Sequence, residues 1–485
     1  MRQLISLILA GGWIAALSGC GPRVNSNAAH TSEAWNQVND PALIGVREQN
    51  LRALPTSGQV SADKMPWRGY WWPTSHGGIS SRWRFEGQGA SYKNFLYPLL
   101  SPTAAAQLSA QQLAGLSPSE KYDLYTGRTD FPLTTALRNA TLHDVVNDQI
   151  PTWHGICHGW AAAATSEEAP GPQATVRLPD GRNLIFYAVD LQALMSQAYS
   201  DFSRFQYRMV GARCDEAHLA RDQFGRPQND SCRDVNPATF HLALAAFIGQ
   251  QHKPFIADMS RDEPVWNYPV VGYSEQFSNY RQISTADALF QVRAPGTVRL
   301  IDVETTVQAL AGASPSAVPA VTQTIPMKFR YSLELDSQDR IIGGEWLTDA
   351  HPDFMWQVLG PPSDLRKTAP LYSYVKGLVE LSRRNVPAPA QTLPGTNGIP
   401  ADGSLAAYAV LRLCNTVTWR YLLDFAHISQ QSAWRIGWYR VGPDDVPATA
   451  DDKNFTRMAD LIPLVQHREL QQLVDFAMRN GWANQ

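Results

Sequence analysis

A cysteine that could serve as a nucleophile lies in the stretch PTWHGICHGWAAAA, residues 151–164. Cys157 follows a glycine and precedes an alanine-rich run that predicts a helix, so we expect its sulfur at the helix N-terminus. Unpaired backbone N–H groups and the helix dipole stabilise a thiolate at that position. The sequence therefore favours a reactive thiol, and the alternative is a buried core cysteine.

A thiol nucleophile needs a base, and the base needs a partner that orients it. His241 is the favoured base because it lies in the first two turns of a helix that we predict after the N-cap Asn236. A predicted strand at 255–257 returns antiparallel to this helix and brings Asp258 back toward the helix start. Asp258 is therefore expected to orient His241.

Other polar residues could also serve as the base or as its orienting partner. Asp262 and Asn267 are rival orienters, and His351 in HPDFMW is a rival base. His241 could also be a packed core histidine, and Asp258 could cap a turn.

Two histidines flank Cys157 and raise the alternative of a metal site. His154 and His158 are four positions apart, but Gly155 and the position before the helix argue against a shared ligand face. No CxxC, HExxH or calcium-loop pattern occurs in the sequence. We expect no metal or other cofactor, and calcium dependence stays open.

Three tryptophans could wall a narrow acyl-binding tunnel that excludes water, namely Trp153, Trp160 and Trp266. Ordinary core packing is the alternative for each of them.

The chain begins with MRQLISLILAGGWIAALSGC, which is typical of a secretory signal. The apolar run Leu4–Leu17 is too short to span a bilayer and ends in small residues. The segment LSGC resembles the bacterial lipobox, in which Cys20 becomes the lipid-modified first residue. Gly21 after this cysteine favours the outer membrane by similarity to sorted lipoproteins. We expect an exported lipoprotein of the cell envelope that faces the periplasm or the cell surface.

Export exposes the remaining cysteines to oxidising conditions. Cys214 and Cys232 end a polar loop, so we predict a disulfide between them. Cys414 lies in an apolar helical stretch and is expected to be a buried thiol. This leaves Cys157 free, and a Cys157–Cys414 bridge is the alternative.

Composition argues against a polyanionic partner. The chain has 485 residues, with 41 basic and 44 acidic side chains and a net charge of -3, and shows no basic stripe with interleaved aromatics. Nucleic acid is therefore not an expected partner. The predicted organisation is a signal peptide at 1–20, a flexible tether at 21–60, a catalytic domain at 61–365 and a mostly helical C-terminal region at 366–485.

Several segments together resemble the transglutaminase elicitor family, founded on an oomycete cell-wall transglutaminase. They are WRGYWWP, SPSEKYD, WHGICHGWA, RDVNPATFH, VWNYPVVGY, and IIGGEW with HPDF, in that order from about Trp67 to Trp356. VWNYPVVGY is similar to the peptide of that family which plants detect, and it departs from it at Tyr268 and Val271.

The resemblance implies an α+β fold of the papain-like or transglutaminase-like kind and acyl transfer as the reaction. A cysteine thiolate would attack the glutamine carboxamide of a protein or peptide, ammonia would leave, and a primary amine would accept the acyl group. Cys157 matches the family's nucleophile by position, and His241 and Asp258 are assigned as base and orienter. A papain-like cysteine peptidase or amidase would use the same residues with water as the acceptor. A catalytically silent envelope-binding lipoprotein is the alternative from a different class.

Overall fold

The computed structural model describes the chain in two units, Met1–Arg383 and Arg384–Gln485. The first unit ends at Arg383, whereas the predicted catalytic domain ends at 365. The structure describes residues 34–83, 92–213, 220–222, 227–229, 232–260, 264–286, 290–317, 319–348, 350–364, 370–384, 400, 402, 404–417, 419–441, 453–479 and 482. The predicted signal peptide and its Cys20 lie outside this set.

An antiparallel sheet of eight strands forms the centre of the first unit, in the order β4-β10-β5-β6-β7-β8-β9 with β1 beside β6. Its strands are β1 (Ser57–Gln59), β4 (Tyr207–Gly211), β5 (Phe255–Asp258), β6 (Asn267–Gln282), β7 (Arg299–Leu310), β8 (Thr324–Leu335), β9 (Ile341–Trp346) and β10 (Phe354–Val358). A separate hairpin pairs β2 (Gln173–Arg177) with β3 (Asn183–Tyr187).

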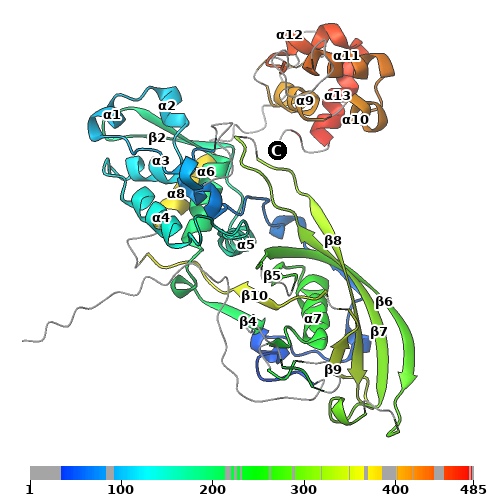
Figure 1. The fold of residues 1–485 in the computed structure, drawn as a ribbon. Coiled ribbons are helices and arrows are strands. Elements are labelled where there is room, and N and C mark those ends of the chain that lie inside the picture. The colour runs from blue at the N-terminus through cyan, green and yellow to red at the C-terminus, as the bar shows by residue number, and fades with distance from the viewer. Residues whose placement is uncertain are drawn as a thin grey trace, which may run out of the picture. The chain divides into compact units, whose positions relative to one another are not determined.

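The helices of the first unit gather mainly at one end of this sheet, as Figure 1 shows. They are α1 (Pro102–Ala106), α2 (Ala110–Ala114), α3 (Pro118–Tyr125), α4 (Pro132–His143), α5 (Cys157–Ser166), α6 (Ala188–Ala198) and α8 (Tyr372–Arg384). Away from them, α7 (Pro237–Ala243) lies against β8 and β9 and continues into the π-helix η9 (Leu244–Gln250). The described 3₁₀ turns are η1 (Pro41–Ile44), η2 (Leu51–Ala53), η3 (Ala62–Lys64), η4 (Thr74–His76), η5 (Gly78–Ser80), η6 (Tyr92–Phe95), η7 (Phe202–Arg204) and η10 (Phe290–Val292).

Side-chain caps explain where several helices begin. In α3 the Ser117 side chain accepts from the backbone N–H of Glu120, while the Glu120 carboxylate accepts from the backbone N–H of Ser117. In α7 the Asn236 side chain accepts from the N–H of Ala238, and proline occupies the first turn. Such caps satisfy N–H groups that lack a partner inside the helix. The helix start predicted after Asn236 is confirmed.

A buried ion pair joins α3 to α6. Lys121 Nζ lies 2.5 Å from Asp190 Oδ2, and neither side chain is exposed. The Asp190 carboxylate also accepts from the indole N–H of Trp83 and the backbone N–H of Tyr187, each at 2.8 Å. These bonds offset the cost of burying both charges.

Residues 34–60 are packed within the first unit, although the sequence predicted a tether at 21–60. Ile44 and Val46 are buried in the main hydrophobic core, and β1 pairs with β6. Burial of these few apolar side chains and pairing of β1 with β6 hold the segment in place, although many of its residues are polar.

The described elements of the second unit are helices around a core of their own, which includes Leu413, Cys414, Ile436 and Leu473. They are α9 (Leu405–Thr416), α10 (Trp419–Phe425), α11 (Gln430–Val441), α12 (Met458–Leu461), η11 (Ile462–Leu464) and α13 (His467–Arg479).

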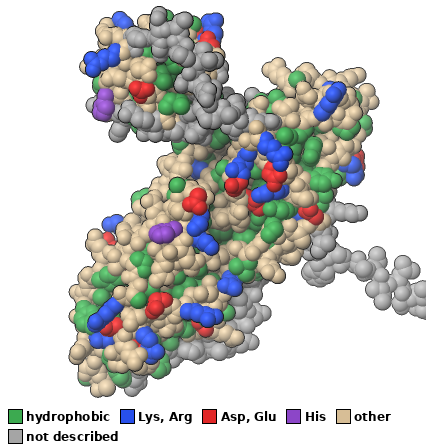
Figure 2. Space-filling view, turned by 180° about the vertical axis from the view of Figure 1, so that it is seen from behind, with side chains coloured by type: hydrophobic (Ala, Val, Ile, Leu, Met, Phe, Trp, Pro, Cys, Tyr) green, Lys and Arg blue, Asp and Glu red, His purple; other side chains and the backbone are tan. Residues whose placement is uncertain are grey.

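The structure has mixed helices and antiparallel sheets, so the α+β class is confirmed. Within the described residues, the helices are all too short or too polar to cross a bilayer. Figure 2 shows Lys, Arg, Asp and Glu interspersed over one face of the molecule, which agrees with the nearly balanced charge of the sequence.

Candidate functional site

Cys157 is the first residue of α5, as the sequence predicted. The preceding residue, Ile156, provides no side-chain cap, and its carbonyl accepts from the N–H of Trp160. The N–H groups of the first turn therefore lack intrahelical partners close to the sulfur. Cys157 is not disulfide-bonded, and the residue is 2% exposed.

Two contacts place the sulfur against the start of β6. Cys157 Sγ lies 3.5 Å from the carbonyl oxygen of Val265, to which the thiol donates. The Asn267 amide nitrogen donates to Sγ over 3.8 Å. The Asn267 oxygen accepts from the indole N–H of Trp356 at 2.7 Å, which fixes the amide with its nitrogen toward the sulfur.

Asp258 lies directly across the sheet from this asparagine. The two residues are register partners in β5 and β6, so their side chains leave the same face of the sheet. Asp258 is fully buried, and its Oδ1 accepts from the backbone N–H of Trp266 at 3.1 Å. Burial raises the pKa of Tyr268, and the nearby negative charges of Cys157 and Asp258 raise it further. Asp258 is thus an ionisable group in the immediate surroundings of the sulfur.

Two further carboxyl groups, those of Asp353 and Asp234, belong to the surroundings of Asp258. The N–H of Asp353 donates to the Asp258 carbonyl at 3.2 Å. Burial raises the pKa of Asp353 to about 10, and the charges of Asp234 and Asp258 add to the effect. Beyond it, His351 Nε2 lies 2.8 Å from Asp234 Oδ2, and His351 Nδ1 lies 3.3 Å from the Thr348 carbonyl. The two ring nitrogens of His351 therefore contact Thr348 and Asp234 and not Cys157.

His241 belongs to a different cluster, so the structure does not bring the predicted base to the thiol. Its Nδ1 lies 2.9 Å from Glu275 Oε1 and 3.1 Å from the Tyr331 hydroxyl. Glu275 is eight positions beyond Asn267 in β6, about 26 Å along an extended strand. The long strand β6 carries the partner of His241 away from Cys157.

The three tryptophans predicted to line a tunnel differ in position. Trp160 is 2% exposed and packs in the core. Trp266 is half-buried beside Asp258, and its ring meets that of Trp71 edge-on at 5.0 Å. Trp153 is also half-buried, with the Arg213 guanidinium 5.6 Å from its ring centre.

The remaining cysteines and His158 have the following positions and partners. Cys157 and Cys414 are both free, which removes the alternative bridge between them. Cys232 is disulfide-bonded, but Cys214 lies outside the described residues, so their pairing stays a prediction. His158 Nε2 lies 2.9 Å from the Ser200 carbonyl. Asp262, a rival orienter, also lies outside the described residues.

The sequence reasoning did not find Asp234, Asp353 or Trp356 as part of the site. Asp234 and Asp353 stand in the RDVNPATFH and HPDF segments that support the family resemblance, which is a signal of the family and not of a role. Trp356 joins the site through pairing of β10 with β5, which no local pattern predicts; Asp353 immediately precedes β10, and Asp234 contacts His351.

Comparisons with known proteins agree with this fold. A family model for the transglutaminase elicitor matches residues 45–384. The crystal structure of the GP42 transglutaminase from Phytophthora sojae is similar, with a TM-score of 0.50 and 23% identity over 72% of this chain and 98% of that chain. This likeness shows the fold. No curated protein matches. The match over most of the chain places this protein in the transglutaminase elicitor family.

Proposed function

We propose that this protein is a thiol acyltransferase that uses Cys157 to move the acyl group of a glutamine side chain to a primary amine. The observation that carries the proposal is a cysteine outside any disulfide at the first residue of α5, with its sulfur 3.8 Å from the amide nitrogen of Asn267. Membership of the transglutaminase elicitor family supports it. A papain-like arrangement, in which a helix presents the cysteine to a sheet, is part of the proposal.

In this mechanism Asp258 accepts the thiol proton, because it is the carboxylate across the sheet from Asn267. The thiolate then attacks the carboxamide carbon, and the Cys157 N–H and the Asn267 amide stabilise the oxyanion. The C–N bond breaks, the nitrogen takes the proton held by Asp258 and ammonia leaves. The acceptor amine attacks the thioester, its proton passes to Asp258, and the C–S bond breaks to release the thiolate. His241 has no role here, since its partner is Glu275.

Burial of the thiol favours transfer over hydrolysis. Cys157 is 2% exposed, and the half-buried rings of Trp71 and Trp266 pack beside the start of β6. A closed apolar wall limits the entry of water to the thioester. We propose Trp266, and with it Trp153, as walls of the acyl path, whereas Trp160 supports the core.

The decisive experiment incubates the purified protein with a glutamine peptide and a tagged primary amine, and measures tag incorporation and ammonia release separately. Cys157→Ser should abolish incorporation with little loss of stability. Asp258→Asn should lower the acylation rate by about 10² to 10⁴, the usual contribution of a general base. Ammonia release without incorporation would instead identify an amidase. No release in the native protein would support the silent binding protein.

Two variants serve as matched controls. Cys414→Ser removes the other free thiol, whose pKa burial raises to about 12, and should retain full activity. Iodoacetamide near neutral pH should accordingly label Cys157 and spare Cys414. His241→Gln should keep the transfer rate when assayed well below its unfolding temperature. A large loss in His241→Gln and none in Asp258→Asn would return the role of base to His241. A parallel assay with a calcium chelator tests calcium dependence.

We further propose that the protein is an exported lipoprotein of the outer membrane, anchored through Cys20, with a Cys214–Cys232 disulfide. The support is the lipobox-like LSGC segment and the oxidising compartment that export implies. Cys20→Ala should leave unprocessed precursor or release the protein from the membrane fraction. Unchanged processing and fractionation would contradict the anchor, and mass mapping of a different bridge would contradict the disulfide.

A further inference from the structure

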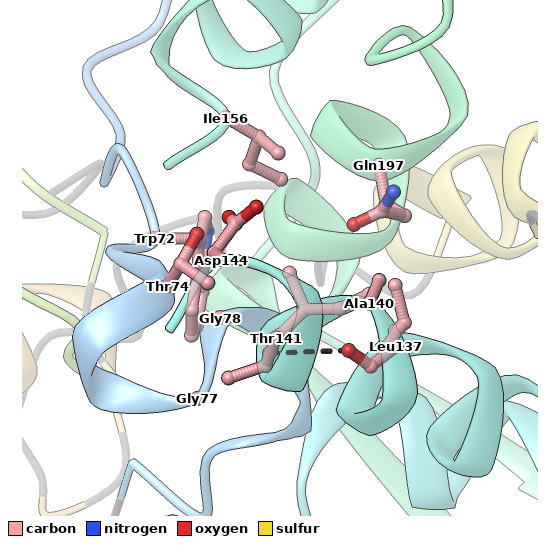
Figure 3. Close-up of a pocket in the computed structure, with 11 residues that line it drawn as sticks. Trp72, Thr74, Gly77, Gly78, Leu137, Ala140, Thr141, Asp144, Ile156 and Gln197 are labelled. Carbon is pink, nitrogen blue, oxygen red and sulfur yellow. Dashed lines mark hydrogen bonds between the residues drawn. The ribbon is translucent and has the colours of Figure 1, made fainter. Parts of the chain in front are cut away.

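A small cavity lies beside the residue that precedes the nucleophile. It has a volume of about 40 Å³ and is bounded by α4, by Gln197 of α6, by the segment 72–79 and by Ile156. Figure 3 shows Asp144 and Gln197 on opposite sides of this space. A cavity of this size holds about two or three water molecules or one small ion.

The Asp144 carboxylate lacks a hydrogen-bond donor from the described part of the chain. The residue is 9% exposed and lines the cavity, and Figure 3 shows its carboxylate directed into the open space. The nearest cationic group is His154, whose Nδ1 lies 3.7 Å from Asp144 Oδ2, beyond hydrogen-bond distance. A carboxylate this deeply buried requires a compensating donor or cation.

The cavity presents a further acceptor, beside the hydroxyl-bearing residues Thr74 and Thr141. Gln197 Nε2 donates to the Ser200 hydroxyl at 2.8 Å, which leaves the Gln197 oxygen on the cavity side. Trp72, 2% exposed, also lines the cavity. One carboxylate and one amide oxygen suit a ligand that carries one positive charge.

We infer that this cavity binds a small monovalent cation and that ammonium is its ligand. Calcium requires six to eight oxygen ligands and magnesium a nearly octahedral set, which a single carboxylate does not provide. The described residues contain no group of three or more His, Cys, Asp or Glu side chains that could hold a metal. Ammonium donates directional hydrogen bonds that match the oxygens of Asp144 and Gln197. The choice of ammonium rests on the proposed function, whose first half-reaction releases ammonia at Cys157, the residue after Ile156.

The test titrates the full-length protein with ammonium chloride and, at equal ionic strength, with tetramethylammonium or potassium chloride, and follows the thermal unfolding midpoint. Ammonium should raise the midpoint in a saturable way, and tetramethylammonium, which is too large, should not. Asp144→Asn should require at least tenfold more ammonium for the same rise. Ala140→Leu fills the cavity without removing its charge and should abolish the rise. The exposed Asp130→Asn should behave like the native protein.

Two results would overturn the inference. The first is no saturable rise with ammonium, or the same rise in Asp144→Asn and Ala140→Leu, since the cavity would then hold water alone. The second is an equal or stronger effect of potassium, which would make ammonium the wrong ligand. Cys157→Ser should still bind ammonium. The unfolding midpoint therefore tests the ammonium site, and amine incorporation tests the proposed reaction, independently of each other.

Discussion

Replacing Asp353 by asparagine tests whether this buried carboxyl group is protonated in the folded protein. Burial and the neighbouring charges of Asp234 and Asp258 raise its pKa from 3.8 to about 10. Between these values the folded state binds one proton more than the unfolded state, so stability falls as pH rises. The slope for one proton is about 1.4 kcal/mol per pH unit, which amounts to at most about 3 kcal/mol between pH 5 and 7.

Asparagine has the shape of the protonated acid and does not titrate. We therefore expect the stability of the Asp353→Asn protein, relative to the native protein, to rise by up to about 3 kcal/mol between pH 5 and pH 7. Denaturant unfolding of the first unit, measured at pH 5, 6 and 7, provides both slopes. Asp130→Asn is the control, because hydrogen bonding to Arg128 lowers the pKa of this exposed carboxylate and keeps it ionised throughout that range. Parallel curves for Asp353→Asn and the native protein would refute the reasoning.

Two further predictions concern the helices that support Cys157. Gly159→Ala places a Cβ 2.2 Å from the Ser196 carbonyl oxygen, so α5 and α6 must separate, and the free energy of unfolding should fall by about 1–3 kcal/mol; an unchanged denaturation midpoint would show that the two helices adjust freely. Lys121→Met leaves the charge of Asp190 without its cation and should cost about 3–5 kcal/mol; the double variant with Asp190→Asn should recover part of this loss, and no recovery would indicate a packing defect.

The parts of the structure that sequence predicts well depend on neighbours along the chain. Asn236 caps α7 by bonding to the N–H of Ala238, two residues on, so the helix start is encoded locally. The hairpin of β8 and β9 follows from alternating apolar residues around a short turn. Cys157 at the start of α5 is of the same kind, because an alanine-rich run after a glycine predicts a helix in any context.

The partner of Cys157 depends on strand pairing between distant segments. Strand β6 runs from Asn267 to Gln282, since pairing with β7 stabilises a stretch whose own pattern is polar. The length of this strand carries Glu275 to His241 and so removes His241 from the thiol. Insertion of β5 between β10 and β6 places Asp258 beside Asn267. Local propensity favours a strand at each position but contains no information on which strands pair, so only the tertiary structure decides which side chain faces the sulfur.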